Sequence, residues 1–239
     1  MGVLTLVRHA QASFHAADYD ELSALGREQA RLLGEFWARR RISFDEVYCG
    51  PRVRQRHTAE IVGSVITGAG KNWPELVVLP ELDEYDLVSL LRHLAPELAR
   101  QDVAFAELLA AHHRDADGPD QMRSFQRVFE ALTMHWATTA HTVAGAEAFT
   151  AFRERVRRGL RRVTEGQRSG RRVAVFTSGG VIGTVVGLAL NAPDRTALEL
   201  NWRVRNCSLT EFVFTKNRIS LDSFNALPHL EDSSLWTYW

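Results

Sequence analysis

The sequence predicts a three-layer α/β fold, in which a mainly parallel sheet carries helices on both faces. Short apolar runs that suit buried strands, beginning with Val3–Val7, alternate with longer segments of helical periodicity. A stretch of mixed helical pattern at 87–145 interrupts this alternation. Because no internal repeat or low-complexity linker divides the 239 residues, we expect one domain, 1–239, with an inserted helical cap at about 87–145.

The helix starts and strand ends of the chain place the expected elements in order. Ser23 suits the N-cap of a helix that runs to about Arg40, because its oxygen can accept a hydrogen bond from a free backbone N–H. Gly50 and Pro51 open a second helix after a short strand at 45–49, since proline is favoured in a first helical turn. Further strands are expected at 76–79, 173–176, 207–214 and 219–224, and further helices at 148–163 and 181–190.

The clearest amphipathic helix is the one predicted at 148–163. Its apolar residues share one face, and they are Phe149, Phe152, Val156, Leu160 and Val163. The opposite face is rich in arginine, at positions 153, 155, 157, 158, 161 and 162. No aromatic residues are interleaved with these arginines for base stacking, so we interpret the face as solvated and expect no nucleic-acid partner. The formal net charge of +0 agrees with this interpretation.

Composition excludes several other classes of protein. A hydrophobic content of 45% and a charged content of 24% are ordinary for a globular protein. No segment approaches the length of a membrane span, and the first apolar run is too short for a signal peptide. The two cysteines, Cys49 and Cys207, fall within predicted strands and form no ligand or disulfide pattern. The sequence therefore predicts a cytoplasmic protein with no membrane partner.

A cationic pair directly follows the first predicted strand. Arg8 and His9 end the apolar run, and open α/β sheets bind their ligands beyond the carboxyl ends of the strands. A transferring phosphoryl group needs cationic donors around its oxygens, and the planar fork of arginine suits that role. A neutral imidazole at His9 could attack phosphorus through one ring nitrogen while a backbone carbonyl holds the other. The pair therefore indicates a phosphate site.

Segments along the whole chain resemble, in order, those of one family. They are Val7–Ala10, Leu22–Ala30, Gly50–Ala59, Glu81–Glu84 and Asn225–Leu230. The first resembles the Arg-His-Gly signature of the histidine phosphatase superfamily, which includes the phosphoglycerate mutases. The second is similar to its Leu-Thr/Ser-x-x-Gly-x-x-Gln-Ala helix entry, and the third to its Ser-Pro-Leu-x-Arg-Ala-x-Gln-Thr-Ala element. The last two resemble its acidic residue and its closing Asn-x-x-x-His-Leu segment. The resemblance implies a phosphoglycerate mutase-like fold.

The resemblance also implies roles for individual residues. His9 would carry the phosphoryl group, Arg8 and Arg54 would bind phosphate, and Glu84 would act as acid and base. No metal and no cofactor would be needed, and the partner would be a small phosphorylated substrate. Neighbouring residues compete for two of these roles: Arg52 and Arg56 with Arg54, and Glu81, Asp83 and Asp86 with Glu84.

One part of the family pattern is missing. The family places a second histidine, followed by glycines, in the loop after its fourth core strand, and this chain has Ser178 there, followed by Gly179 and Gly180. Serine can donate one hydrogen bond but cannot present a cation. Losing one preorganised donor from such a site costs on the order of 3 kcal/mol. Because the loop leads straight into a helix, we expect the Ser178 hydroxyl and the backbone around Gly179 to bind phosphate instead.

Three functions remain in order of preference. The first is a metal-independent phosphatase that works through a phosphohistidine at His9, and the second is a catalytically weakened protein that binds a phosphorylated ligand. The third is a phosphoglycerate mutase, which must protect its phosphoenzyme from water. The sequence contains no Gly-x-x-x-x-Gly-Lys-Ser/Thr loop, no Gly-x-Ser-x-Gly around Ser178 and no His-Glu-x-x-His pair.

The chain ends in an aromatic cluster of Trp236, Tyr238 and Trp239. These side chains could pack on the core, close the pocket or form an interface. The sequence leaves their role, the identity of the substrate and the oligomeric state open.

Overall fold

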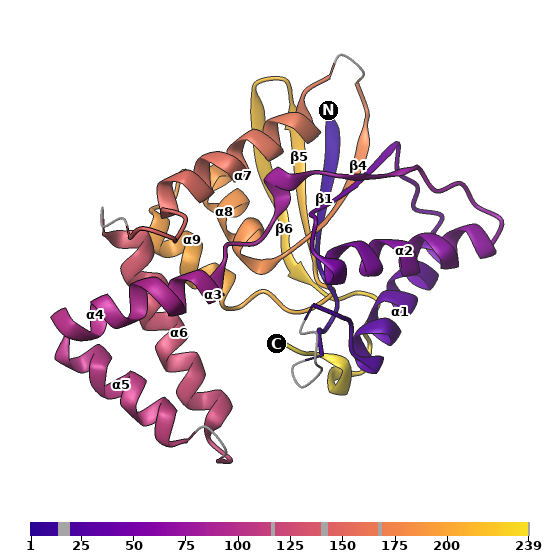
Figure 1. Ribbon diagram of the computed structural model, residues 1–239. Helices are drawn as coiled ribbons and strands as arrows, with labels where there is room; N and C mark the ends of the chain where they lie inside the picture. The colour runs from indigo at the N-terminus through magenta and orange to yellow at the C-terminus, as the bar shows by residue number, and fades with distance from the viewer. Residues whose placement is uncertain (14–19, 116–117, 140–142, 167–168, 239) are drawn as a thin grey trace.

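A computed structural model describes residues 1–13, 20–115, 118–139, 143–166 and 169–238. The centre of the fold is a mixed sheet of strands in the order β3-β2-β4-β1-β5-β6 (Figure 1). The strands are β1 Gly2–Arg8, β2 Glu46–Cys49, β3 Leu76–Val78, β4 Arg172–Thr177, β5 Leu209–Thr215 and β6 Arg218–Ala226. The α/β prediction is confirmed, and every strand expected from the sequence is present within a few residues.

The sheet is parallel on one side of β1 and antiparallel on the other. β1 pairs in parallel with β4, β4 with β2, and β2 with β3. β5 and β6 form a hairpin that adds to the other edge of β1 in antiparallel orientation. The parallel strands therefore bring their carboxyl ends to one edge, where Arg8 lies beside Thr177 and ligands of open α/β sheets bind.

Helices cover both faces of the sheet. α1 Ala24–Arg40 and α2 Val53–Gly68 pack on one face around Val7, Trp37 and Phe176. α7 Phe149–Thr164 and α8 Gly179–Leu190 pack on the other face, with Leu4 and Leu6. The predicted N-cap of α1 is confirmed, because the Ser23 side chain accepts a hydrogen bond from the backbone N–H of Gly26.

Most of the described part of segment 87–145, expected to be a helical cap, is helical up to Thr138, and residues 140–142 lie outside the described residues. It contains α3 Leu87–Ser89, a π-helical turn Leu90–Leu94, α4 Ala95–Gln101, α5 Val103–Arg114 and α6 Gln121–Thr138. Figure 1 shows α4, α5 and α6 projecting to one side of the sheet, and we refer to residues 87–138 as the cap helices. None of the helices among the described residues is both long and apolar enough to cross a bilayer.

Two details of the fold differ from the sequence prediction. The arginine face of α7 is only partly solvated, because three of its arginines pair with acidic residues of other segments: Arg153 with Asp194, Arg155 with Glu147 and Arg162 with Glu81. The helix α9 Asp194–Asn201 was not expected from the sequence. It is short, and it follows α8 after only three residues, Asn191 to Pro193.

Candidate active site

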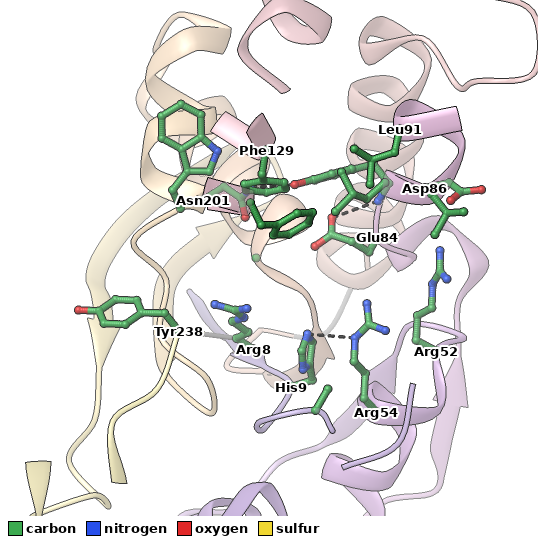
Figure 2. A pocket seen from close by; sticks show the side chains of 17 residues that line it. Arg8, His9, Arg52, Arg54, Glu84, Asp86, Leu91, Phe129, Asn201 and Tyr238 are labelled. Carbon is green, nitrogen blue, oxygen red and sulfur yellow. Dashed lines mark hydrogen bonds between the residues drawn. The ribbon is translucent and has the colours of Figure 1, made fainter. Parts of the chain in front are cut away.

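A cavity of about 310 Å³ opens at the carboxyl end of the parallel strands. Its floor contains Arg8 and His9 from the end of β1, and Arg54 from the first turn of α2. Glu84, from the loop after β3, and Gly179, from the start of α8, also line it. Figure 2 shows His9 between Arg8 and Arg54, with Glu84 above them. The structure thus brings these five predicted residues, from distant parts of the chain, to one cavity.

The His9 imidazole is buried and held in one orientation. Its Nδ1 lies 2.9 Å from the carbonyl oxygen of Ala10, and its Nε2 lies 3.2 Å from the Nε of Arg54. A guanidinium can only donate, so Nε2 accepts from Arg54 and the ring proton resides on Nδ1, which donates to Ala10. Burial, followed by the charges of Arg54 and Arg8, holds the pKa of His9 well below its usual value. His9 is therefore a neutral imidazole whose Nε2 lone pair accepts the hydrogen bond from Arg54.

Contacts behind the cavity fix the first turn of α2. The Asp20 carboxylate accepts from Arg54 Nη1 and from the backbone N–H of Val53, both at 2.7 Å. The hydroxyl of Thr58 accepts from the backbone N–H of Ala10 at 3.1 Å and donates to the carbonyl of Arg54 at 2.7 Å. These bonds connect the end of β1 to the helix that carries Arg54. They therefore fix the position of Arg54 relative to Arg8.

The Glu84 carboxyl group occupies the start of α8. It accepts hydrogen bonds from the backbone N–H of Gly180 at 3.0 Å and from that of Tyr85 at 3.1 Å. Burial raises the pKa of Glu84, although these two hydrogen bonds and the charges of Arg54 and Arg8 oppose the rise. A side chain at position 180 would meet the Glu84 carboxylate, since a Cβ there would lie 2.2 Å from its Oε1. The absence of a side chain at Gly180 thus lets the Glu84 carboxyl group approach the start of α8. Its raised pKa favours the protonated form, which a proton donor requires.

Ser178 lies behind the wall of the cavity and is not one of the lining residues. Its buried hydroxyl accepts a hydrogen bond from Gln55 Nε2 at 2.7 Å, and Gln55 Oε1 accepts from the backbone N–H of Arg52 at 3.1 Å. Gln55 stands where the resembling motif has alanine, so its larger side chain fills the space beside Ser178. Phosphate binding by Ser178 stays a prediction, whereas Gly179 reaches the cavity itself.

The sequence assigns no role in the site to several lining residues, of which Arg52 and Asp86 are named there only as competitors of Arg54 and Glu84. Arg52 lines the cavity beside Arg54, with its Nε bonded to Asp83 at 2.7 Å. Asn201 and Trp202 come from the end of α9, which was not predicted, and the cap helices contribute apolar side chains. Pro193 followed by Asp194, a combination that often opens a helix, was the available signal for α9.

Tyr238 is another lining residue, so part of the aromatic cluster at the chain end contributes to the cavity wall. Its hydroxyl accepts from Arg205 Nε at 3.1 Å, and Trp239 lies outside the described residues. The preceding Thr237 donates to Asn206 Oδ1 at 2.9 Å, and Asn206 Nδ2 donates to the carbonyl of His9 at 3.3 Å. The chain end is therefore linked to the backbone of His9 through one buried side chain.

In the described part of the chain, no group of three or more histidine, cysteine, aspartate or glutamate side chains is arranged to hold a metal ion. Two guanidiniums, one neutral imidazole and one carboxyl group with a raised pKa suit a dianionic phosphoryl group.

Comparison with known proteins gives results for sequence and for structure. The family model described as "Histidine phosphatase superfamily (branch 1)" matches residues 4–132 and 111–227. No curated protein sequence matches the chain.

Solved structures share the fold at low sequence identity. The α-ribazole phosphatase from Shigella flexneri is 23% identical with a TM-score of 0.59, over 94% of this chain and 96% of that chain. A mycobacterial glucosyl-3-phosphoglycerate phosphatase is 21% identical with a TM-score of 0.61, over 95% and 100%. A phosphoglycerate mutase from Bacillus anthracis str. Sterne is 18% identical with a TM-score of 0.62, over 96% and 95%. These likenesses cover nearly the whole chain.

Proposed function

Because this chain belongs to the histidine phosphatase superfamily, we propose that it hydrolyses small phosphomonoesters through a phosphohistidine intermediate at His9. The observation that carries the proposal is the orientation of the imidazole. Its Nδ1–H is bonded to the Ala10 carbonyl, and its Nε2 lone pair accepts from Arg54 Nε, a bond that a bound phosphoryl group would have to displace before Nε2 attacks. A nucleophile needs a free electron pair held in line with the phosphorus atom.

In the first step, His9 Nε2 attacks phosphorus and the bond from phosphorus to the ester oxygen breaks. Arg8 and Arg54 neutralise the charge on the equatorial oxygens, and Glu84 gives its proton to the leaving oxygen. In the second step, the Glu84 carboxylate takes a proton from a water molecule, whose oxygen attacks phosphorus. The bond from Nε2 to phosphorus breaks, inorganic phosphate leaves, and His9 is again a neutral imidazole.

Glu84 provides a test that depends on the leaving group. For Glu84→Gln we expect kcat with an alkyl phosphate to fall by roughly 10²- to 10⁴-fold, because an alkoxide needs a proton to leave. The fall should be much smaller with p-nitrophenyl phosphate, whose leaving group is stable as an anion. The assay is the release of inorganic phosphate, with His9→Ala as the inactive control. Equal losses for both esters would contradict the role of Glu84, and wild-type release equal to that of His9→Ala would contradict the proposed hydrolysis.

A second candidate, a phosphorylated-ligand-binding protein of weak activity, has one observation in its favour. The Ser178 hydroxyl is bonded to Gln55, and the Gly180 N–H is bonded to Glu84, so two groups at the start of α8 already have partners. Binding of phosphate esters without release above the His9→Ala background would support this candidate. Transfer of phosphate to a second alcohol in place of water would instead support a mutase.

A further inference from the structure

The cavity has two chemically different ends. Arg8, His9, Arg54 and Glu84 form the end that suits a phosphoryl group. The opposite end is formed by the cap helices, which contribute Leu87, Val88, Leu91, Phe125 and Phe129 to the lining. All of these cap side chains are apolar. The part of an ester that extends away from phosphorus therefore meets aliphatic and aromatic carbon.

Two polar side chains near the apolar end, Asp86 and Tyr85, already have partners, whereas the indole N–H of Trp202 in the lining has none among the described residues. The Asp86 carboxylate accepts from the backbone N–H of Ser89 at 3.1 Å and from its hydroxyl at 2.6 Å. The hydroxyl of Tyr85 accepts from Asn201 Nδ2 at 3.3 Å. No lysine, arginine or histidine of the described cap helices is among the lining residues. A leaving group with hydroxyls or a carboxylate would lose its hydration here and gain few hydrogen bonds in return.

The solvent exposure of Val88 also favours an apolar ligand at this end of the cavity. Val88 is 64% exposed although it lines the cavity, so its side chain is open to solvent. The rings of Phe125 and Phe129 lie with their centroids 6.3 Å apart and nearly parallel, on the part of α6 that faces the cavity. An apolar ligand would remove such surface from water, and area removed from water is the main source of affinity in a cavity of this type.

We propose that the substrates of this protein are phosphomonoesters with an apolar leaving group, such as an alkyl chain of about six carbons or an aryl ring. This inference rests on the proposed function for the phosphoryl end and extends it to the other end of the same cavity. It predicts discrimination against esters of glycerate and of sugars. A volume of about 310 Å³ is at the small end of ligand pockets, which suits one ester of moderate size.

Binding of n-alkylphosphonates tests the apolar end without requiring hydrolysis. Their carbon–phosphorus bond is not a phosphate ester, so the Kd can be measured by titration calorimetry even if turnover is absent. Each methylene that leaves water is worth at most about fourfold in Kd. We expect hexylphosphonate to bind roughly 10- to 100-fold more tightly than ethylphosphonate. 2-Carboxyethylphosphonate should bind more weakly than butylphosphonate, because its carboxylate meets no cation of the cap.

A matched pair of variants locates the effect. Val88→Asn places a polar side chain in the cavity, and Val103→Asn makes the same change on α5, where Val103 is 76% exposed and outside the lining. Both residues are exposed, so neither change disturbs the core. We expect Val88→Asn to weaken hexylphosphonate by roughly five- to tenfold while ethylphosphonate changes less than twofold. Val103→Asn should leave both Kd values as in the wild type.

The outcomes separate this inference from the proposed hydrolysis. Equal Kd values for ethyl- and hexylphosphonate, or equal effects of the two valine variants, would overturn the apolar leaving group even if phosphate esters are hydrolysed. Tighter binding with chain length that is lost in Val88→Asn would support it even if wild-type hydrolysis equals that of His9→Ala. Binding that depends on chain length, without hydrolysis above that of His9→Ala, would contradict the proposed catalysis but would support the proposed apolar ligand class.

Discussion

The double substitution Gln55→Ala and Ser178→His should raise kcat for phosphate esters by roughly 10²- to 10³-fold. The motif resemblance predicts that Ser178 replaces the family's second histidine, and an imidazole there would supply an additional donor to the phosphoryl oxygens in the transition state. Removing one such donor from a preorganised site costs on the order of 3 kcal/mol, and restoring one should gain a comparable factor.

The structure explains why both positions must change together. Gln55 and Ser178 are buried, with the Gln55 amide 2.7 Å from the Ser178 hydroxyl. Ser178→His adds about four heavy atoms and Gln55→Ala removes about four, so the pair approximately conserves volume. Ser178→His alone would overpack this region and destabilise the fold by about 1–3 kcal/mol. Gln55→Ala alone loses the bond to the backbone N–H of Arg52, which costs about 1 kcal/mol as the loss of a helix cap.

The assay compares kcat and the thermal midpoint Tm for the wild type, both single variants and the double variant. The expected result is a gain in kcat for the double variant alone, with a Tm close to that of Gln55→Ala. A double variant that keeps this Tm and hydrolyses no faster than the wild type would refute the reasoning. The missing donor would then not be what limits the rate.

Three further results are expected. Arg54→Lys should lower kcat/KM by roughly 10²-fold, because an ammonium cannot bond His9 and Asp20 together as the guanidinium does; loss of less than threefold would count against it. Thr237→Val should lower the free energy of unfolding by about 1–3 kcal/mol, since it leaves buried partners unpaired, as urea titration would show. The buried His229 has a pKa lowered to about 4 with both ring nitrogens unpartnered. It is neutral when folded but charged when unfolded below about pH 6.5, so stability is lost as pH falls through this range. Between pH 7.5 and 4.5 the wild type should lose about 2–3 kcal/mol more than His229→Phe.

The predictable parts of the fold are those set by local chemistry. Ser23 caps α1 as its side chain predicts, and the apolar stripe of α7, from Phe149 to Val163, is buried. β1 ends at Arg8, where the apolar run of the sequence ends. In each case the signal lies within a few neighbouring residues, because capping and amphipathic periodicity act over one or two turns.

The parts that the sequence analysis missed or left open depend on contacts between distant segments. The bond between Gln55 and Ser178 joins residues 123 positions apart, and nothing near either residue in the sequence indicates it. Tyr238 reaches the cavity because Thr237 and Asn206 anchor the chain end beside β1. Arg155 was expected in solvent but bonds Glu147 and the carbonyl of Asp83. Periodicity shows that a residue lies on the outer face of a helix, but not what packs against that face.

Burial acts at the same time on His9, the proposed nucleophile, and on Glu84, the proposed acid. The same loss of solvent lowers the pKa of His9 and raises that of Glu84, so both groups are favoured in their neutral forms, as attack and proton donation require. Arg8 and Arg54 lower both pKa values, which assists His9 but opposes Glu84. A bound phosphate dianion would offset the charge of these two guanidiniums. Their opposition to the protonation of Glu84 would then weaken, so the arrival of the substrate itself would favour the protonated form of Glu84 that the first step needs.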